Sequence, residues 1–203
     1  MRAALVGLMV GAAPTGASVV VYDTFGPGGS FDASQGYVVA GDDVPYALNE
    51  GQTHGVRFRA GVGGQIERID AGLQLISGTD TVWMELWSAA GNGDVGSMLA
   101  SWVIDDRMDF FGGSGTVSVE PGLGGPVLDA GERYWLISRA LNDTDASWMY
   151  GEAGTGPFVW ERPDGVRVYS RSTLPAVRVT VVPAPGTFTF LACALSAGTR
   201  RRR

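Results

Sequence analysis

Three residues in one short segment carry the chemistry of sugar recognition. Trp83, Glu85 and Trp87 alternate with the apolar residues of the segment 81–88. Successive strand residues point to opposite faces, so these three side chains share the outward face if the apolar ones face a core. Flat rings beside a carboxylate suit stacking on, and hydrogen bonding to, a saccharide. The alternative is that both strand faces are covered and the rings are core residues, as large aromatic residues usually are.

Acidic residues are the other candidates for chemistry. The chain has 21 Asp and Glu, and two facing carboxylates would suit glycoside hydrolysis. Most of these acids stand in turn-like contexts, where they normally cap turns in contact with solvent. We therefore expect a non-enzymatic protein with no catalytic residues. An extracellular carbohydrate-active hydrolase that uses paired carboxylates is the alternative.

Calcium is the one metal that the acidic residues suggest. Short acidic clusters at 42–43, 105–109 and 142–145 offer the oxygen ligands that calcium prefers. The run that starts at Asp143 alternates oxygen-bearing side chains, but it lacks the glycine at the sixth position of an EF-hand loop. Turn formation is the simpler role for these clusters, so no cofactor is expected unless calcium binds in the loops.

The basic and sulfur-containing residues exclude several activities. All fifteen basic residues are arginine, which leaves no lysine for phosphate-loop, kinase, Schiff-base or serine-lysine chemistry. One Cys and one His cannot form an internal disulfide or a multi-histidine zinc site. The single imidazole, His54, shares the phase of Val56 and Phe58, which places it at the start of a strand, and no nucleophile-elbow motif accompanies it.

Charge argues against nucleic acid as a partner. Five of the arginines stand at the two ends of the chain, so ten arginines face 21 acids in the body, a net charge of −11. Such a body repels phosphate backbones and anionic lipid.

The body alternates short apolar runs with turn signals, a pattern typical of β-strands. Val56 and Phe58 point one way while Arg57 and Arg59 point the other. Alternation also continues through 66–76, and further strands are predicted at 81–88, 98–104, 116–119, 133–141, 166–170 and 176–182. Turns are predicted at 77–80, 91–94, 111–115, 121–126 and 152–157. This pattern predicts one all-β domain over 18–182, an antiparallel, jelly-roll-like β-sandwich.

The N-terminal segment reads as a signal peptide. Arg2 is followed by the apolar run 3–13, a breaking Pro14 and the small residues 15–17. This order is typical of a segment cut by signal peptidase, and we place the cut after Ala17.

The C-terminal segment 183–203 combines three unlike elements. Pro183, Ala184, Pro185 and Gly186 precede the apolar segment 187–198, and the chain ends in Arg200, Arg201, Arg202 and Arg203. Twelve residues would rise about 18 Å as a helix, which is short of the roughly 30 Å of a hydrocarbon core. The arginines would stay on the cytoplasmic side, so we expect transient membrane contact.

This tail resembles the PEP-CTERM sorting signal of bacterial surface proteins, which is also labelled an ice-binding protein C-terminal motif. Ala184 stands where that signal often has Glu. The resemblance implies export, processing by an exosortase-type enzyme near the proline-rich motif, and release or anchoring at the cell surface among exopolysaccharide. The ice-binding label finds no regular Thr-x-Thr ladder in the body to support it.

The body resembles the bacterial choice-of-anchor domains, closest to type R. The resemblance is carried, in order, by the segments 23–28, 82–88, 96–99, 134–137, 148–150 and 175–179. It implies an extracellular sandwich without defined catalytic residues. We therefore expect a secreted surface or matrix protein whose partners are signal peptidase, an exosortase-type enzyme and exopolysaccharide.

Overall fold

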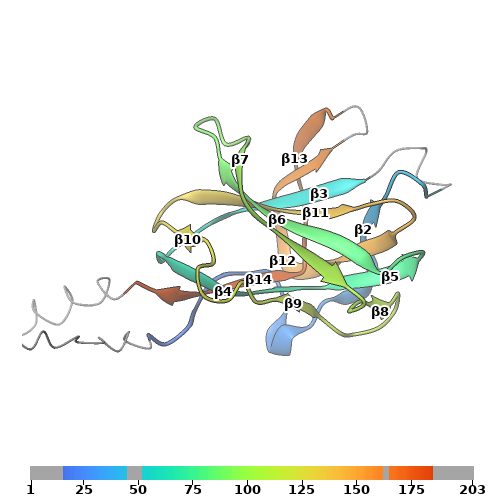
Figure 1. The fold of residues 1–203 in the computed structure, drawn as a ribbon, viewed down its shortest axis with the longest axis horizontal. Helices are drawn as coiled ribbons and strands as arrows, with labels where there is room; N and C mark the ends of the chain where they lie inside the picture. Colours follow the sequence, from blue (N-terminus) through green and yellow to red (C-terminus); the bar gives the residue numbers. More distant parts are fainter. Residues whose placement is uncertain (1–15, 45–51, 162–164, 185–203) are drawn as a thin grey trace, which may run out of the picture.

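The chain folds into two β-sheets packed face to face, as Figure 1 shows. The computed structural model describes residues 16–44, 52–161 and 165–184 of the 203. In these residues the only helical element is a 3-10 turn at Pro27–Gly29. The predicted all-β antiparallel sandwich is confirmed, with one parallel pair between β5 and β8.

The smaller sheet has five strands and carries both ends of the described chain. Its order is β1, β14, β4 and β10, and β9 also pairs with β4. The bounds of these strands are β1 Val19–Asp23, β4 Gly64–Ala71, β9 Val117–Val119, β10 Val127–Leu128 and β14 Val177–Pro183.

The larger sheet has nine strands. Its order is β7, β6, β11, β3, β12, β5 and β8, and both β2 and β13 pair with the long strand β12. The bounds of these strands are β2 Asp32–Ala40, β3 Thr53–Arg59, β5 Leu73–Ser77, β6 Thr81–Ala89, β7 Val95–Asp105, β8 Asp109–Phe110, β11 Arg133–Ala140, β12 Asp145–Glu161 and β13 Arg167–Pro175.

The main hydrophobic core lies between the two sheets. Ile69 and Val179 of the smaller sheet share it with Val56 and Leu86 of the larger one. Burial of this apolar surface is the main term that favours folding. The alternation predicted for β3 is confirmed, since Val56 and Phe58 are buried while Arg57 is half-buried and Arg59 exposed.

Two local predictions were wrong. The segment 152–157 was predicted as a turn, but it lies inside β12. Its two glycines have different roles, since a Cβ at Gly156 would lie 2.7 Å from Leu174 Cδ2, whereas Gly154 has a φ of +82° and open space around it. Strict alternation also fails in β4, where Ile66 and Ile69 are both buried, because the pairing with β14 shifts register between Thr180 and Val181.

The two described ends of the chain lie at the same end of the sandwich, whereas β2, β5 and β8 lie at the other (Figure 1). Pro183 of the predicted sorting motif is the last residue of β14, where it pairs with Gly64, and Ala184 follows it exposed. The rest of the motif, Pro185, Gly186 and Arg200 to Arg203, lies outside the described residues, as does most of the predicted signal peptide. Among the described residues, no helix is long and apolar enough to span a membrane.

Candidate functional site

Trp83, Glu85 and Trp87 lie together on the outer face of the larger sheet. Their neighbours Val82, Met84 and Leu86 are fully buried in the core, so the predicted orientation of this strand is confirmed. Both Trp side chains are half-buried, while Glu85 is only 8 % exposed. These three side chains are thus neither fully exposed to solvent nor part of the main core.

Glu85 is held by an ionic network that joins side chains from four strands of the larger sheet, β6, β11, β12 and β13. Its Oε2 accepts a hydrogen bond from Trp87 Nε1 at 2.9 Å, and its Oε1 lies 3.6 Å from Arg139 Nε. Arg139 also reaches Glu161, with Nη2 to Oε1 at 3.2 Å, and Arg167 Nε donates to Glu161 Oε2 at 2.7 Å. We call Glu85, Arg139, Glu161 and Arg167 the outer-face network. Its two carboxylates and two guanidinium groups balance in charge.

A small second core fixes this network. Trp135, Ile137 and Val159 are buried on the outer side of the sheet, where Trp87 packs against them. Two elements cover them, the turn between β6 and β7 and the strand β13. Trp135 Nε1 donates to the Gly93 carbonyl at 3.1 Å, and the ring of Tyr169 lies 5.7 Å from that of Trp135. The two covering elements are joined as well, because the Val95 N–H donates to the Tyr169 hydroxyl at 3.1 Å.

Arginine side chains lie over two of the Trp rings. The Arg167 guanidinium lies 5.1 Å from the Trp87 ring centroid, and that of Arg57 lies 5.5 Å from Trp135. Such cation–π contacts order both partners. The arrangement presents preorganised hydrogen-bond donors and acceptors beside aromatic surface: Glu161 accepts from two guanidinium groups, and Glu85 accepts from Trp87 and forms an ion pair with Arg139. Polar recognition of a ligand needs groups held in this way.

The sequence missed three of the four network residues. Arg139 belongs to a predicted strand, and its position opposite Trp83 in the β6–β11 pairing follows only from the register. Glu161 and Arg167 face each other across the β12–β13 pair. The available signal was that each of these charged side chains points outward from its strand. The pairing register brings the side chains together, and the sequence does not reveal that register.

His54 lies apart from this network. It is buried on β3, where its Nε2 lies 2.8 Å from the Val38 carbonyl and its ring stacks on Phe158. Burial is the main reason that the pKa of His54 falls from 6.5 to about 4. A neutral, buried imidazole in these contacts is a packing residue.

The acidic clusters have separate partners. The Thr79 hydroxyl donates to Asp143 at 2.7 Å, whereas Asp145 is fully buried and burial raises the pKa of its carboxyl. Asp42 and Asp43 are exposed. Across the parts of the chain that the structure describes, no three His, Cys, Asp or Glu side chains are grouped so as to hold a metal. Calcium binding stays a prediction without an assigned ligand set.

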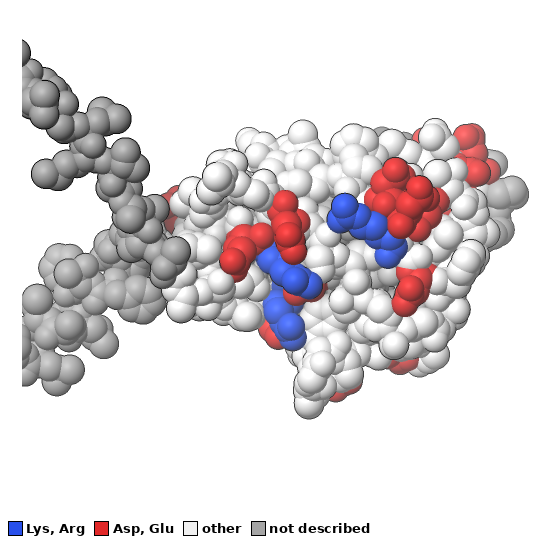
Figure 2. Space-filling view, turned by 60° about the horizontal axis from the view of Figure 1, so that its bottom comes forward, with Lys and Arg blue, Asp and Glu red and all other residues white. Residues whose placement is uncertain are grey.

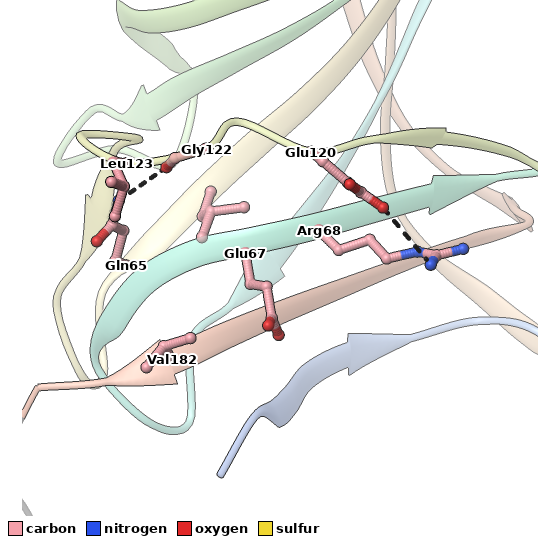
Figure 3. Close-up of a pocket in the computed structure, with 8 residues that line it drawn as sticks. Gln65, Glu67, Arg68, Glu120, Gly122, Leu123 and Val182 are labelled. Atoms are coloured by element: carbon pink, nitrogen blue, oxygen red, sulfur yellow. Dashed lines mark hydrogen bonds and ion pairs between the residues drawn. The ribbon is translucent and has the colours of Figure 1, made fainter. Parts of the chain in front are cut away.

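A hollow of about 560 Å³ lies on the outer face of the smaller sheet. Figure 3 shows Arg68 and Glu120 at one end of it and Leu123 with Gly122 at the other. Arg68 is already paired, with Nε 2.5 Å from Asp70 Oδ1 and Nη1 3.8 Å from Glu120 Oε1. Figure 2 shows acidic and arginine side chains side by side on this face. Its charges are therefore largely matched within the protein.

Comparisons with known proteins assign no family to this chain. No family model matches it, and no curated protein matches it significantly. The resemblance to the PEP-CTERM signal and to the choice-of-anchor domains stays a prediction from the residues quoted above.

Proposed function

We propose that this chain is an exported, non-enzymatic bacterial protein of the cell surface or extracellular matrix. In this proposal signal peptidase removes the first seventeen residues and an exosortase-type enzyme processes the tail. The sandwich then binds exopolysaccharide through the outer face of its larger sheet. The acidic body agrees with this assignment, because it would avoid nucleic acid and anionic lipid.

One observation carries the proposed sugar binding. Trp83 and Trp87 flank Glu85 on an outer face, and the network holds Glu85 in place. Saccharides are bound by aromatic surface together with fixed polar groups, and a site that is already ordered loses less entropy when the ligand binds. Arg139 and Arg167 add donors beside the same rings.

The fold is compatible with processing at the tail. β14 ends at Pro183, so a cut beyond that residue would leave all strands of the smaller sheet in the product. Mass spectrometry of surface-released protein should find neither residues 1–17 nor Arg200 to Arg203. Recovery of the full 203-residue chain from the cytosol would contradict the proposed export.

Affinity electrophoresis through gels that contain different polysaccharides tests the binding. We expect Trp87→Ala and Trp83→Ala to weaken retention about tenfold, since each removes a ring. Trp102→Ala is the matched control, because Trp102 is a half-buried Trp that packs against the main core instead. Equal retention of all three variants and the wild type would reject the outer-face site.

The hydrolase alternative has its own measurement. Glu85 and Glu161 are the carboxylates that Arg139 brings together, so they would be the pair to examine. Release of reducing ends from a polysaccharide by the wild type, lost in both Glu85→Gln and Glu161→Gln, would replace the non-enzymatic assignment.

A further inference from the structure

We infer that the protein has a second binding site, for a neutral saccharide, in a hollow of about 360 Å³ between β2, β12 and the loop after β8. This site shares no residue with Trp83, Trp87 or the outer-face network, and it is tested separately from the proposed outer-face site. It is lined by Ser34, Gln35, Gly36, Val38, Ile76, Phe111, Ser147 and Tyr150.

Among the described residues, none of those that line the hollow is charged, although the body of the chain is strongly acidic. An anionic ligand would find no counter-charge here and would lose its hydration without compensation. The lining is divided between hydrogen-bonding groups, the Gln35 amide and the Ser34 and Tyr150 hydroxyls, and apolar surface from Phe111 and Ile76. A pyranose ring has the same division, with hydroxyl groups at its edge and C–H groups on its faces. The chemistry of the hollow therefore fits an uncharged sugar.

Phe111 is held in an exposed position by hydrogen bonds of its own backbone and of the two residues that follow. Its side chain is 47 % exposed, and Ile76 in the same lining is 37 % exposed, so apolar surface is grouped at this hollow. The Phe111 N–H donates to the Leu75 carbonyl at 2.8 Å. The fully buried Gln74 holds the next two residues, because its Oε1 accepts from the Gly112 N–H at 2.9 Å and its Nε2 donates to the Gly113 carbonyl. The loop is thus fixed in a conformation that keeps this ring at the hollow.

The polar wall is ordered too. Asp32 Oδ1 accepts from the Ser34 hydroxyl at 2.6 Å, which leaves the Ser34 oxygen free to accept from a ligand. The Tyr150 ring lies 4.9 Å from the Tyr37 ring in an edge-on contact, and the Tyr37 hydroxyl donates to the Thr173 carbonyl at 2.8 Å. Preorganised groups of this kind reduce the entropy lost on binding.

The site lies at the end of the sandwich opposite the described chain ends, as the positions of β2, β5 and β8 in Figure 1 show. A body held by its C-terminal tail would present this end away from the membrane. If the proposed outer-face site also binds, one molecule would join two polysaccharide chains, which is a consequence that rests on the proposed function.

The test compares three single variants of the full chain by affinity electrophoresis in laminarin, dextran, hydroxyethylcellulose and alginate. Phe111→Ala and Gln35→Ala each truncate an exposed lining side chain, and Phe110→Ala is the matched control. Phe110 is the adjacent residue and is more exposed, at 71 %, but it does not line the hollow. Unfolding midpoints measured on all variants show that each one is folded.

We expect the wild type to be retained by at least one of the three neutral polysaccharides. Retention should fall about tenfold in Phe111→Ala and clearly in Gln35→Ala, and stay unchanged in Phe110→Ala. The inference is overturned if no neutral polysaccharide retains the wild type, if both lining variants behave as wild type, or if all three variants lose retention together. Retention by alginate that disappears in the same two variants would also overturn it. Loss in Trp87→Ala alone would support the proposed outer-face site and reject this one.

Discussion

The burial of His54 predicts a specific loss of stability in mild acid. The Val38 carbonyl accepts from Nε2, so the proton of the neutral ring is on that nitrogen. The other nitrogen, Nδ1, is buried without a hydrogen-bond partner. Protonation would therefore place a charge on a ring packed against both Tyr37 and Phe158, with no acceptor at Nδ1.

The magnitude follows from the gap between the two pKa values. The pKa of His54 is about 4 in the fold and 6.5 in an unfolded chain. Between these values the unfolded state binds more protons than the folded one, so stability falls as the pH falls from above 6.5 to 4. At about 1.4 kcal/mol per pH unit, the loss at pH 4 is about 3 kcal/mol.

The assay is urea unfolding of the wild type and of His54→Gln from pH 7.5 to 4. Glutamine keeps an N–H donor for the Val38 carbonyl and does not titrate, and acidic groups elsewhere affect both proteins alike. The free energy of unfolding of the wild type should drop by about 3 kcal/mol relative to the variant over this range. Parallel stability curves would refute the reasoning, as would an NMR titration of the single imidazole with its midpoint near 6.5.

Three further perturbations have expected outcomes that follow from single contacts. Gly36→Ala should destabilise the fold by about 2 kcal/mol in thermal unfolding, because the new Cβ would lie 2.7 Å from the Trp148 carbonyl, whereas Gly61→Ala meets open space and should change stability by less than about 0.5 kcal/mol. Thr24→Val should cost about 2 kcal/mol in urea unfolding, because the buried Thr24 Oγ1 lies 2.6 Å from the Pro175 carbonyl and accepts from the Val177 N–H at 2.7 Å; a change below about 0.5 kcal/mol would contradict this. Asp145→Asn should be the more stable protein in urea unfolding at pH 7, because burial raises the pKa of the Asp145 carboxyl and its ionisation at higher pH disfavours the fold; the gap should close as the pH falls through that raised pKa, and a gap that widens in acid would show the sign to be wrong.

The sequence predicts a strand and its orientation correctly where one face of that strand is buried and the other is not. Alternation in β3 and β6 follows directly from burial of Val56, Met84 and Leu86, so period two appears in the sequence. β12 shows the opposite case. A Cβ at Gly151 would meet the Thr24 carbonyl, so this glycine permits a close approach between segments far apart in sequence. From local composition, a glycine is interpreted as a turn residue. Only the tertiary contact shows that it allows two segments to pack closely.

The candidate sites show the same contrast between residues that one strand carries and residues that several strands bring together. The stripe of Trp83, Glu85 and Trp87 was readable because its residues lie on one strand. The other three residues of the outer-face network lie on other strands, and the loop that fixes Phe111 depends on Gln74, a polar residue buried by contacts made elsewhere. Sequence patterns report what one strand does, whereas a site assembled from several strands depends on register and loop closure.

Under the proposed function, the position of the tail assigns attachment to the smaller sheet and ligand binding to the larger one. β14, the strand that leads to the tail, pairs along its length with β4 on one side and β1 on the other. Force transmitted from a membrane through residue 183 would act along β14 and so would be shared by two antiparallel ladders at once. Both proposed binding surfaces lie on the larger sheet, which meets the smaller one through the side chains of the core. Attachment and binding would therefore act on separate hydrogen-bonded units, so that strain at the tail need not disturb the groups that contact a sugar.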